Sequence, residues 1–390
     1  MAQLDNTEIA FRYRSDKDLK LGYYLFSFIN SPLITRMGIA ATGFAIKLNL
    51  PIKKLIKQTI FKQFCGGENM VEAAQTAEVI GKYKVGVILD YGVEGKENEE
   101  EFDRATNEFI KAINFAASQK NIPFVSLKVT GFARFALMEK INSGEKLTDN
   151  EAAEWQRVHN RIERVCSAAY EKKIMILIDA EETWIVEPVN ELTEKMMEQF
   201  NKERALIFNT YQLYCHGTLP FLRDCVDKAA AKGYILGAKL VRGAYMEKER
   251  TRAAEKGYPD PIQPDKKTTD NDYDEAVIFC LQNLGKLALF IGTHNEKSCL
   301  DAVNYMELHG IEAGNPYVYF SQLYGMGDNI SFNLADAGYN VSKYLPYGPV
   351  LDVVPYLMRR AEENTSVAGQ TSRELGLIKK EIGRRKRVNK

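Results

Sequence analysis

The sequence is poor in histidine and tryptophan, with four and two among 390 residues, and its six cysteines are scattered. They form no CxxC pair and no Cys/His spacing typical of zinc sites, so we expect reduced thiols, no disulfides and no bound metal. Basic and acidic residues balance at 52 each. This balance gives no support for a nucleic acid partner and favours a small-molecule ligand recognised by a local charge cluster.

Long hydrophobic runs are also missing. Acidic residues stand within the first ten positions, which is unlike a signal peptide. The most apolar early segment, 37–46, is closed by Arg36 and Lys47 and is much shorter than the roughly 20 residues that span a bilayer. We expect this segment to form a buried helix and the protein to be cytoplasmic.

Eight apolar, β-branched runs of strand length are present, each bounded by turn residues. They span 85–92, 124–131, 173–180, 205–212, 235–243, 287–295, 317–325 and 340–348. Segments with helical periodicity lie between several of them: 100–119, 154–171, 189–203 and 219–233. The alternation predicts a (β/α)8 barrel over 81–370, preceded by a helical elaboration over 1–80 and followed by a basic tail over 371–390.

Barrels of this kind place their active sites at the carboxyl ends of the strands, where this sequence is rich in polar groups. They include Asp90, Lys128, Asp179, Asn209, Arg242, Tyr245, Thr293, His294, Asn295, Gln322 and Tyr344. Buried without partners these groups would destabilise the barrel, so we expect them to surround one ligand.

A pair of adjacent arginines, Arg359 and Arg360, lies in the last helical segment. Two guanidiniums side by side favour a carboxylate or phosphate ligand. An equally weighted interpretation is a solvated helix face on which Arg359 pairs with Glu363 four residues later.

Single residues at the strand ends are less specific. Lys128 and Asp179 form either a catalytic pair or a structural ion pair. Lys239 and Arg242 add cations, and Gly243 permits close backbone approach. His294 is either a packed hydrogen-bonding residue or a cofactor contact, and we prefer the second.

Common nucleotide and hydrolase motifs are missing from the sequence. No GxGxxG follows a strand, and no P-loop, HExxH or GxSxG occurs. The residues alone therefore predict a barrel enzyme with a cationic, tyrosine-lined mouth.

Several segments, in order along the chain, resemble the proline dehydrogenase family. They are FCGGE (64–68), SLKVTG (126–131), LIDAEETW (177–184), IFNTYQ (207–212), GAKLVRGAYM (237–246), GTHN (292–295), QLYGMGDNISF (322–332) and KYLPYGPVLDVVPYLMRRAEEN (343–364). The resemblance implies a distorted (β/α)8 barrel that binds FAD without a Rossmann domain. It also implies oxidation of L-proline to Δ1-pyrroline-5-carboxylate, with electrons passed to a quinone.

The resemblance also implies roles for individual residues. Arg359, Arg360 and Lys128 bind the proline carboxylate, Tyr344 and Leu323 pack on the ring, Asp179 orients Lys128 and Tyr344, and Tyr245 closes over the substrate. The flavin contacts are Asn209, Lys239, Arg242, Gly243, Ala244, Thr293, His294, Asn295 and Glu363.

Two features refine these implications. Many bacterial relatives have Gln and Arg where this chain has Asn209 and Lys239, so the resemblance does not specify the contacts around the flavin N5 atom in detail. No fused aldehyde dehydrogenase follows, so we expect a monofunctional enzyme.

Alternatives remain at this point. Hydroxyproline is a second substrate candidate, although the bulk of Tyr344 favours proline. A lyase or aldolase would use Lys128 or Lys239 as a Schiff base, and a non-catalytic barrel would retain only the anion site.

The segment 376–390 carries seven basic residues and one acid. It is either a solvated tail or a peripheral contact to the inner face of the cell membrane.

Overall fold

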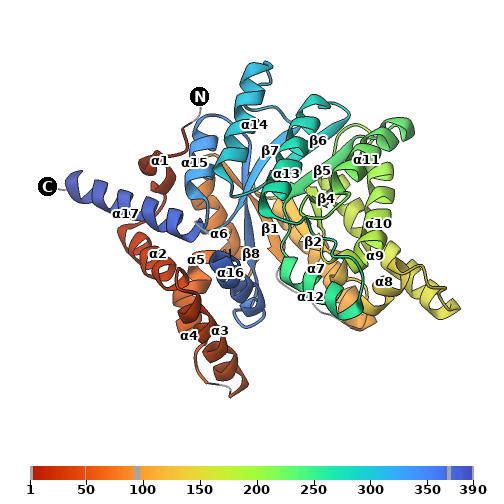
Figure 1. The fold of residues 1–390 in the computed structure, drawn as a ribbon, viewed down its shortest axis with the longest axis horizontal. Helices are drawn as coiled ribbons and strands as arrows, with labels where there is room; N and C mark the ends of the chain where they lie inside the picture. Colours follow the sequence, from red (N-terminus) through yellow and green to blue (C-terminus); the bar gives the residue numbers. More distant parts are fainter. Residues whose placement is uncertain (1–2, 49, 92–96, 367–369, 389–390) are drawn as a thin grey trace. The chain divides into compact units, whose positions relative to one another are not determined.

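The computed structural model describes residues 3–48, 50–91, 97–366 and 370–388, with side chains described for all of these except 32 and 362–370. Eight parallel strands close into a barrel in the order β1 to β8 (Figure 1). The strands are β1 (Val85–Tyr91), β2 (Phe124–Lys128), β3 (Met175–Asp179), β4 (Ile207–Gln212), β5 (Leu236–Val241), β6 (Leu287–Gly292), β7 (Val318–Leu323) and β8 (Val341–Tyr347). Each lies inside one predicted segment, so the predicted (β/α)8 barrel is confirmed.

The chain divides into two compact units, one of Met1–Val93 with Gln322–Lys390 and the other of Glu94–Ser321. The first, which we call the terminal unit, contains the parallel pair β1 and β8. Its helices are α1 (Thr7–Phe11), α2 (Asp16–Ile29), α3 (Pro32–Lys47), α4 (Lys53–Ile56), the π-helix η1 (Lys57–Phe61), α5 (Lys62–Phe64), α6 (Met70–Gly81), α15 (Asp328–Asp336), α16 (Val354–Ser366) and α17 (Gln370–Val388).

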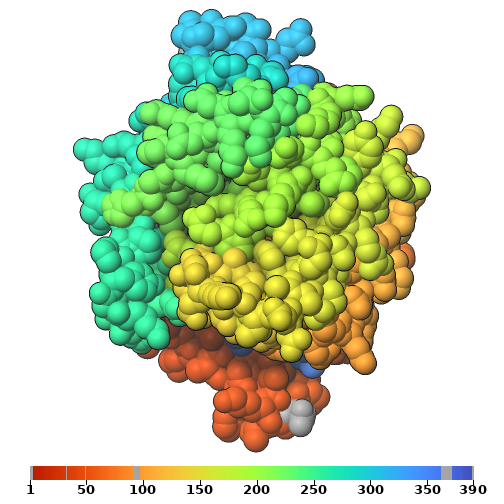
Figure 2. Space-filling view, turned by 90° about the vertical axis from the view of Figure 1, so that its right-hand side faces the viewer, coloured from red at the N-terminus to blue at the C-terminus, as the bar shows by residue number. Residues whose placement is uncertain are grey.

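The second, which we call the central unit, contains β2 to β6 and most of β7. Its helices are α7 (Glu99–Ala117), α8 (Phe135–Asn142), α9 (Asp149–Lys172), α10 (Val186–Phe200), α11 (Thr218–Lys232), α12 (Met246–Lys256), α13 (Lys266–Gln282) and α14 (Glu296–Leu308), with 3-10 turns η2 (Val129–Gly131) and η3 (Thr183–Ile185). Figure 2 shows one face of this unit, where α9, α10 and α11 (yellow to green) form the outer surface.

Local sequence explains where these helices begin and end. Thr148 and Glu151 form a capping box at the start of α9, which satisfies two backbone N–H groups there. A different helix, α11, ends at Gly233, which has a φ of 68°.

An aromatic layer fills the interior of the central unit. Phe124 of β2 packs edge-on against Phe290 of β6 and Tyr319 of β7, with ring centroids 5.2 and 5.1 Å apart. Phe208 of β4 contacts both Phe124 and Phe290. Layers built from alternate strands are the usual core of such barrels.

The terminal unit has its own apolar core, to which the C-terminal segment contributes. The predicted tail forms α17, where Leu377 and Ile378 are buried in the cluster that includes Phe26 and Phe64. Arg385 of α17 pairs with Asp16 of α2 at 2.8 Å.

One expectation for the terminal unit is wrong. Residues 37–46 are helical, as predicted, but Met37 and Phe44 are each 64% exposed. The apolar content of α3 indicated burial, whereas the helix packs against its neighbours through its other side, where Thr35 is buried. Among the residues described, no helix combines the length and the apolar composition required to cross a bilayer.

Candidate active site

Three charged residues lie at or near the carboxyl ends of strands in the central unit. Lys128 and Asp179 are register neighbours, at the last positions of β2 and β3. Lys239 of β5 is buried and donates to Asp179 Oδ1 from Nζ at 2.5 Å. The predicted proximity of Lys128 and Asp179 is confirmed at backbone level, and the Asp179 carboxylate is held by Lys239.

Asn209 lies on β4, the strand between β3, which carries Asp179, and β5, which carries Lys239. It is 2% exposed. Its Nδ2 donates to Asn190 Oδ1 at 2.9 Å, and its Oδ1 accepts from the Thr210 backbone N–H at 2.9 Å. The Asn209 amide is therefore fixed by its neighbours.

Arg242, directly after β5, is held by three side chains. Its Nε donates to Asp270 Oδ1 at 2.6 Å, Nη1 to Thr293 Oγ1 at 2.8 Å and Nη2 to Ser298 Oγ at 3.0 Å. The guanidinium also lies over the ring of Tyr273, 4.3 Å from its centroid. Each Nη atom carries a second N–H, so the held cation can still donate to an anionic ligand.

Gly243 follows in a backbone conformation that requires glycine. Its φ is 142°, and a Cβ atom here would lie 2.4 Å from the ring of Tyr214. Gly243 and Ala244 are both exposed, and Tyr245 stands at the N-cap position of α12. Backbone groups of this turn are therefore open to a ligand.

The GTHN motif forms the turn from β6 into α14. Thr293 is buried, and its Oγ1 also accepts from the Asn295 backbone N–H at 3.1 Å. The Asn295 side chain caps α14 by accepting from the N–H groups of Lys297 and Ser298. His294 is partly buried between these two fixed residues.

Other predicted site residues belong to the terminal unit. Leu323 is the last residue of β7, and Tyr344 of β8 is 8% exposed. The Tyr344 carbonyl accepts from the Tyr324 N–H at 2.8 Å. This bond ties the β7 end to β8 beside the two predicted ring contacts.

Arg359 and Arg360 lie on α16 and are partly buried. The Arg360 guanidinium is 5.1 Å from the centroid of the Tyr356 ring. The side chain of Glu363 lies outside the described residues, so its predicted pairing with Arg359 stays a prediction.

A buried charge network next to Tyr344 was not predicted. Lys343 of β8 is completely buried and pairs with Asp328 Oδ1 at 2.9 Å. Asp328 Oδ2 also accepts from Tyr13 at 2.8 Å and pairs with Arg14 at 3.0 Å. Burial alone would raise the pKa of Asp328, but the charges of Lys343 and Arg14 hold that pKa below its ordinary value. Lys343 immediately precedes Tyr344, so the network fixes the backbone at a predicted site residue.

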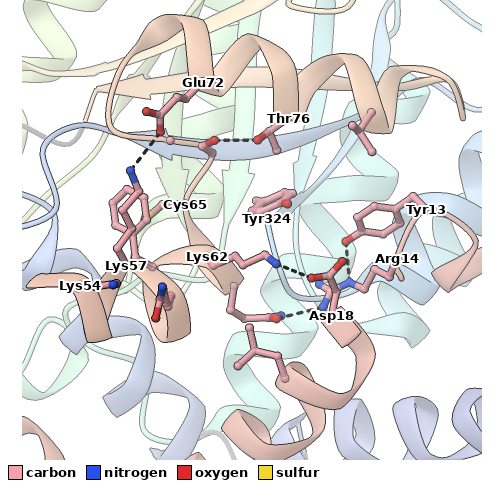
Figure 3. Close-up of a pocket in the computed structure, with 17 residues that line it drawn as sticks. Tyr13, Arg14, Asp18, Lys54, Lys57, Lys62, Cys65, Glu72, Thr76 and Tyr324 are labelled. Carbon is pink, nitrogen blue, oxygen red and sulfur yellow. Dashed lines mark hydrogen bonds and ion pairs between the residues drawn. The ribbon is translucent and has the colours of Figure 1, made fainter. Parts of the chain in front are cut away.

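The terminal unit also contains a pocket of about 600 Å³. Figure 3 shows Tyr13, Arg14 and Tyr324 on one side of it and the lysines Lys54 and Lys57 on another. None of the predicted site residues lines it. The pocket adjoins the charge network through Arg14 and Tyr13.

An eight-stranded parallel barrel with fixed cations at its strand ends is the architecture of a (β/α)8 barrel enzyme. The sequence profile described as proline dehydrogenase matches residues 73–373. The chain therefore belongs to the proline dehydrogenase family, which makes it an oxidoreductase.

Individual relatives agree with this assignment. The chain is 34% identical over 323 residues to the carbapenem antibiotics biosynthesis protein CarD of Pectobacterium carotovorum, covering 83% of each chain. It is 31% identical to mitochondrial proline dehydrogenase 1 of Dictyostelium discoideum, covering 87% of this chain and 67% of the relative. A hydroxyproline dehydrogenase of Xenopus laevis is also 31% identical, with coverage of 85% and 78%.

Solved structures show the same fold. The proline utilization A structure from Bdellovibrio bacteriovorus, inactivated by N-propargylglycine, superposes with a TM-score of 0.72 at 22% identity. The match covers 81% of this chain and 34% of that one, so this chain spans about a third of the larger protein.

Proposed function

We propose that this chain oxidises L-proline to Δ1-pyrroline-5-carboxylate with FAD as cofactor and passes the electrons to a quinone. The observation that carries the proposal is the family match over residues 73–373. Support comes from the fixed cations Lys239 and Arg242, which fall in segments of the family resemblance.

The residues of the central unit fit an anionic cofactor such as FAD. Arg242 and Lys266 share the single carboxylate of Asp270, so this group of three keeps a net positive charge. The open backbone at Gly243 permits close approach. When bound, FAD supplies the acceptor, flavin N5, for the hydride that leaves proline C5.

The cofactor contacts proposed from the resemblance are Asn209, Lys239, Arg242, Gly243, Ala244, Thr293, His294, Asn295 and Glu363. Their common task is to fix the cofactor relative to the substrate, because orientation is the main contribution a protein makes to hydride transfer. The hydrogen bonds that hold Asn209 and Arg242 support such a task, since both side chains are ordered by the protein itself.

For the substrate, we assign Arg359, Arg360 and Lys128 to the carboxylate, because guanidinium and ammonium groups form strong charge-assisted hydrogen bonds with it. Tyr344 and Leu323 pack against the pyrrolidine ring. Asp179, itself held by Lys239, orients Lys128 and Tyr344, and Tyr245 covers the bound substrate.

The visible spectrum of the purified protein tests the function. We expect flavin absorbance that is bleached by L-proline under anaerobic conditions and restored by a soluble quinone. A colourless protein that cannot be reconstituted with FAD contradicts the proposal. Trapping of a carbonyl substrate by borohydride on Lys128 or Lys239 would instead identify a Schiff-base enzyme.

Hydroxyproline is the second candidate substrate, favoured by the similarity to a hydroxyproline dehydrogenase. Tyr344 opposes it, because a buried tyrosine leaves less room for a hydroxyl on the ring. Comparison of kcat/KM for the two substrates decides between them. We expect Tyr344→Ser to shift the ratio toward hydroxyproline.

A further inference from the structure

Helix α12 of the central unit, which follows the turn at Gly243, packs with very little apolar surface. All of its residues are described, and two of them, Glu249 and Ala253, are buried. Ala253 contributes a single methyl group, so apolar burial does little to hold this helix in place. The other buried side chain is a carboxylate, which is costly to bury unless it accepts hydrogen bonds.

Glu249 accepts two hydrogen bonds from one residue of another element. Its Oε1 accepts from the Thr183 backbone N–H at 2.7 Å, and its Oε2 accepts from Thr183 Oγ1 at 2.6 Å. Thr183 begins η3, four residues after Asp179 at the end of β3. Both oxygens of the buried carboxylate therefore attach α12 to the turn that follows Asp179.

Glu249 is also joined to Tyr245 through the first turn of α12. Tyr245 is the N-cap residue, and its carbonyl accepts from the Glu249 N–H at 2.9 Å. This is the hydrogen bond with which the helix begins. A displacement of Glu249 from Thr183 would therefore carry Tyr245 with it.

The ion pairs of α12 lie nearer to the surface. They are Lys248 with Glu182, Arg250 with Asp260, and Arg252 with Glu139. In each pair at least one side chain is open to water, and exposed ion pairs contribute little to stability. Hydrogen bonds to a charged group away from water are stronger. The contact between Glu249 and Thr183 is therefore the firmest polar attachment of this helix.

We propose that Glu249 is a positioning residue, which holds the start of α12 on the turn after β3 and so keeps Tyr245 in place. The inference rests on the proposed function, in which Tyr245 covers the bound substrate. Glu249 touches neither substrate nor flavin in this assignment and acts through Tyr245. A cover that is ordered before the substrate arrives loses less conformational entropy on binding, which favours a lower KM.

Steady-state kinetics of the holoenzyme with proline and a soluble dye test the proposal, with rates expressed per bound flavin. Glu249→Ala removes both hydrogen bonds and should raise the KM for proline at least roughly fivefold, with a smaller change in kcat. Glu249→Gln should restore most of the lost affinity. Its amide oxygen can accept from the Thr183 N–H, and the Thr183 hydroxyl can rotate to accept from its NH2 group.

Thr183→Val provides a second route to the same contact if Glu249→Ala does not fold. It removes the hydroxyl and keeps the backbone N–H, so KM should rise in the same direction by a smaller factor. The matched control is Lys248→Gln, which breaks the exposed pair with Glu182 on the same helix. Its KM should stay within about twofold of that of the unmodified protein.

A double variant separates positioning from general support of the fold. Tyr245→Ala removes the cover itself. Adding Glu249→Ala to this variant should change KM by less than about twofold, because residues that act through one another are not additive. Full additivity of the two substitutions overturns the proposal, as does an unchanged KM in Glu249→Ala or an equal rise in KM in Lys248→Gln.

Hydrogen exchange adds a readout that does not depend on the reaction. The backbone amides of 246–256 should exchange faster in Glu249→Ala than in the unmodified protein or in Lys248→Gln, because the attachment of α12 is lost. If proline does not bleach the unmodified protein, the proposed function fails and the substrate-covering role fails with it. If proline bleaches it but neither exchange nor KM changes in Glu249→Ala, the role of Glu249 alone is overturned.

Discussion

Lys343 Nζ lies 2.9 Å from Asp328 Oδ1, and both side chains are almost completely buried. The ammonium also donates to the backbone carbonyls of Met326 at 2.6 Å and Leu323 at 3.3 Å. One buried cation thus connects β8 to the turn that follows β7. The residues on either side of this connection, Leu323 and Tyr344, are the two proposed ring contacts.

Lys343→Met should therefore destabilise the protein strongly. Among the described residues, the substitution leaves the buried Asp328 with Arg14 as its one cationic partner, and breaking a buried ion pair from one side costs about 3–5 kcal/mol. Urea unfolding measures the change. Lys111→Met is the control, because its pair with Glu108 is exposed and should contribute less than about 1 kcal/mol. Equal unfolding midpoints for the two variants would contradict a structural role for Lys343.

The raised pKa of Glu374 predicts how the stability of the folded state depends on pH. Burial, with the neighbouring Asp328 charge, raises the pKa of the Glu374 carboxyl from 4.5 to about 7. A raised pKa means that the folded state holds its proton more tightly than the unfolded state. The stability that this bound proton adds to the folded state is fully present below pH 4.5 and is lost as pH rises through 7.

Glu374→Gln should remove this pH dependence and keep the acceptor for the Gly327 N–H. Compared with the unmodified protein, the variant should gain up to about 3 kcal/mol in relative stability between pH 4.5 and pH 8. Unfolding measured across this range gives the difference. Parallel stability curves for the two proteins would show that Glu374 titrates normally. Asp328, whose pKa is lowered, affects the pH dependence of stability in a separate range, because its stabilising contribution is lost only as pH falls below about 4.

Much of the fold could be predicted because periodicity is local. Strands β1 to β8 and helices such as α9 follow from apolar runs and caps within a few residues. The network around Asp328 could not be predicted, since Arg14 and Asp328 are more than 300 positions apart and nothing in either local segment indicates the pairing. The exposure of α3 was missed for a related reason, because the sequence of an apolar helix does not show whether its apolar face is buried or exposed.

The candidate site shows the same division. Strand-end positions identified Lys128, Asp179 and Arg242 as candidates. The partners of Arg242 were not identified, because Asp270 and Ser298 lie 28 and 56 residues further along the chain on helices α13 and α14. The pairing of Asp179 with Lys239 depends on side-chain reach across β4, which a strand pattern does not specify.

The three side-chain hydrogen bonds that fix Arg242 lead to a prediction about the cofactor. Arg242→Lys keeps the charge but loses the planar group that contacts Asp270, Thr293 and Ser298 together. We expect FAD to bind at least roughly tenfold more weakly, since two or more hydrogen bonds that fix the cation are lost. Flavin fluorescence released on dilution measures the affinity. Arg250→Lys is the control, because that arginine pairs with Asp260 near the surface. Retention of FAD at the original affinity would remove Arg242 from the cofactor site.

The paired arginines of α16 give the most direct test of substrate binding. Arg359→Met and Arg360→Met should each raise the KM for proline while kcat changes less and FAD stays bound, because the loss falls on anchoring of the carboxylate. Loss of a charge-assisted hydrogen bond of about 1.5–3 kcal/mol corresponds to roughly 10- to 150-fold in KM. Arg104→Met, on the exposed face of α7, is the matched control. Steady-state kinetics with a soluble acceptor, together with the flavin spectrum, separate the two effects. Unchanged KM in both α16 variants would favour the alternative of a solvated helix face and leave Lys128 as the remaining carboxylate contact.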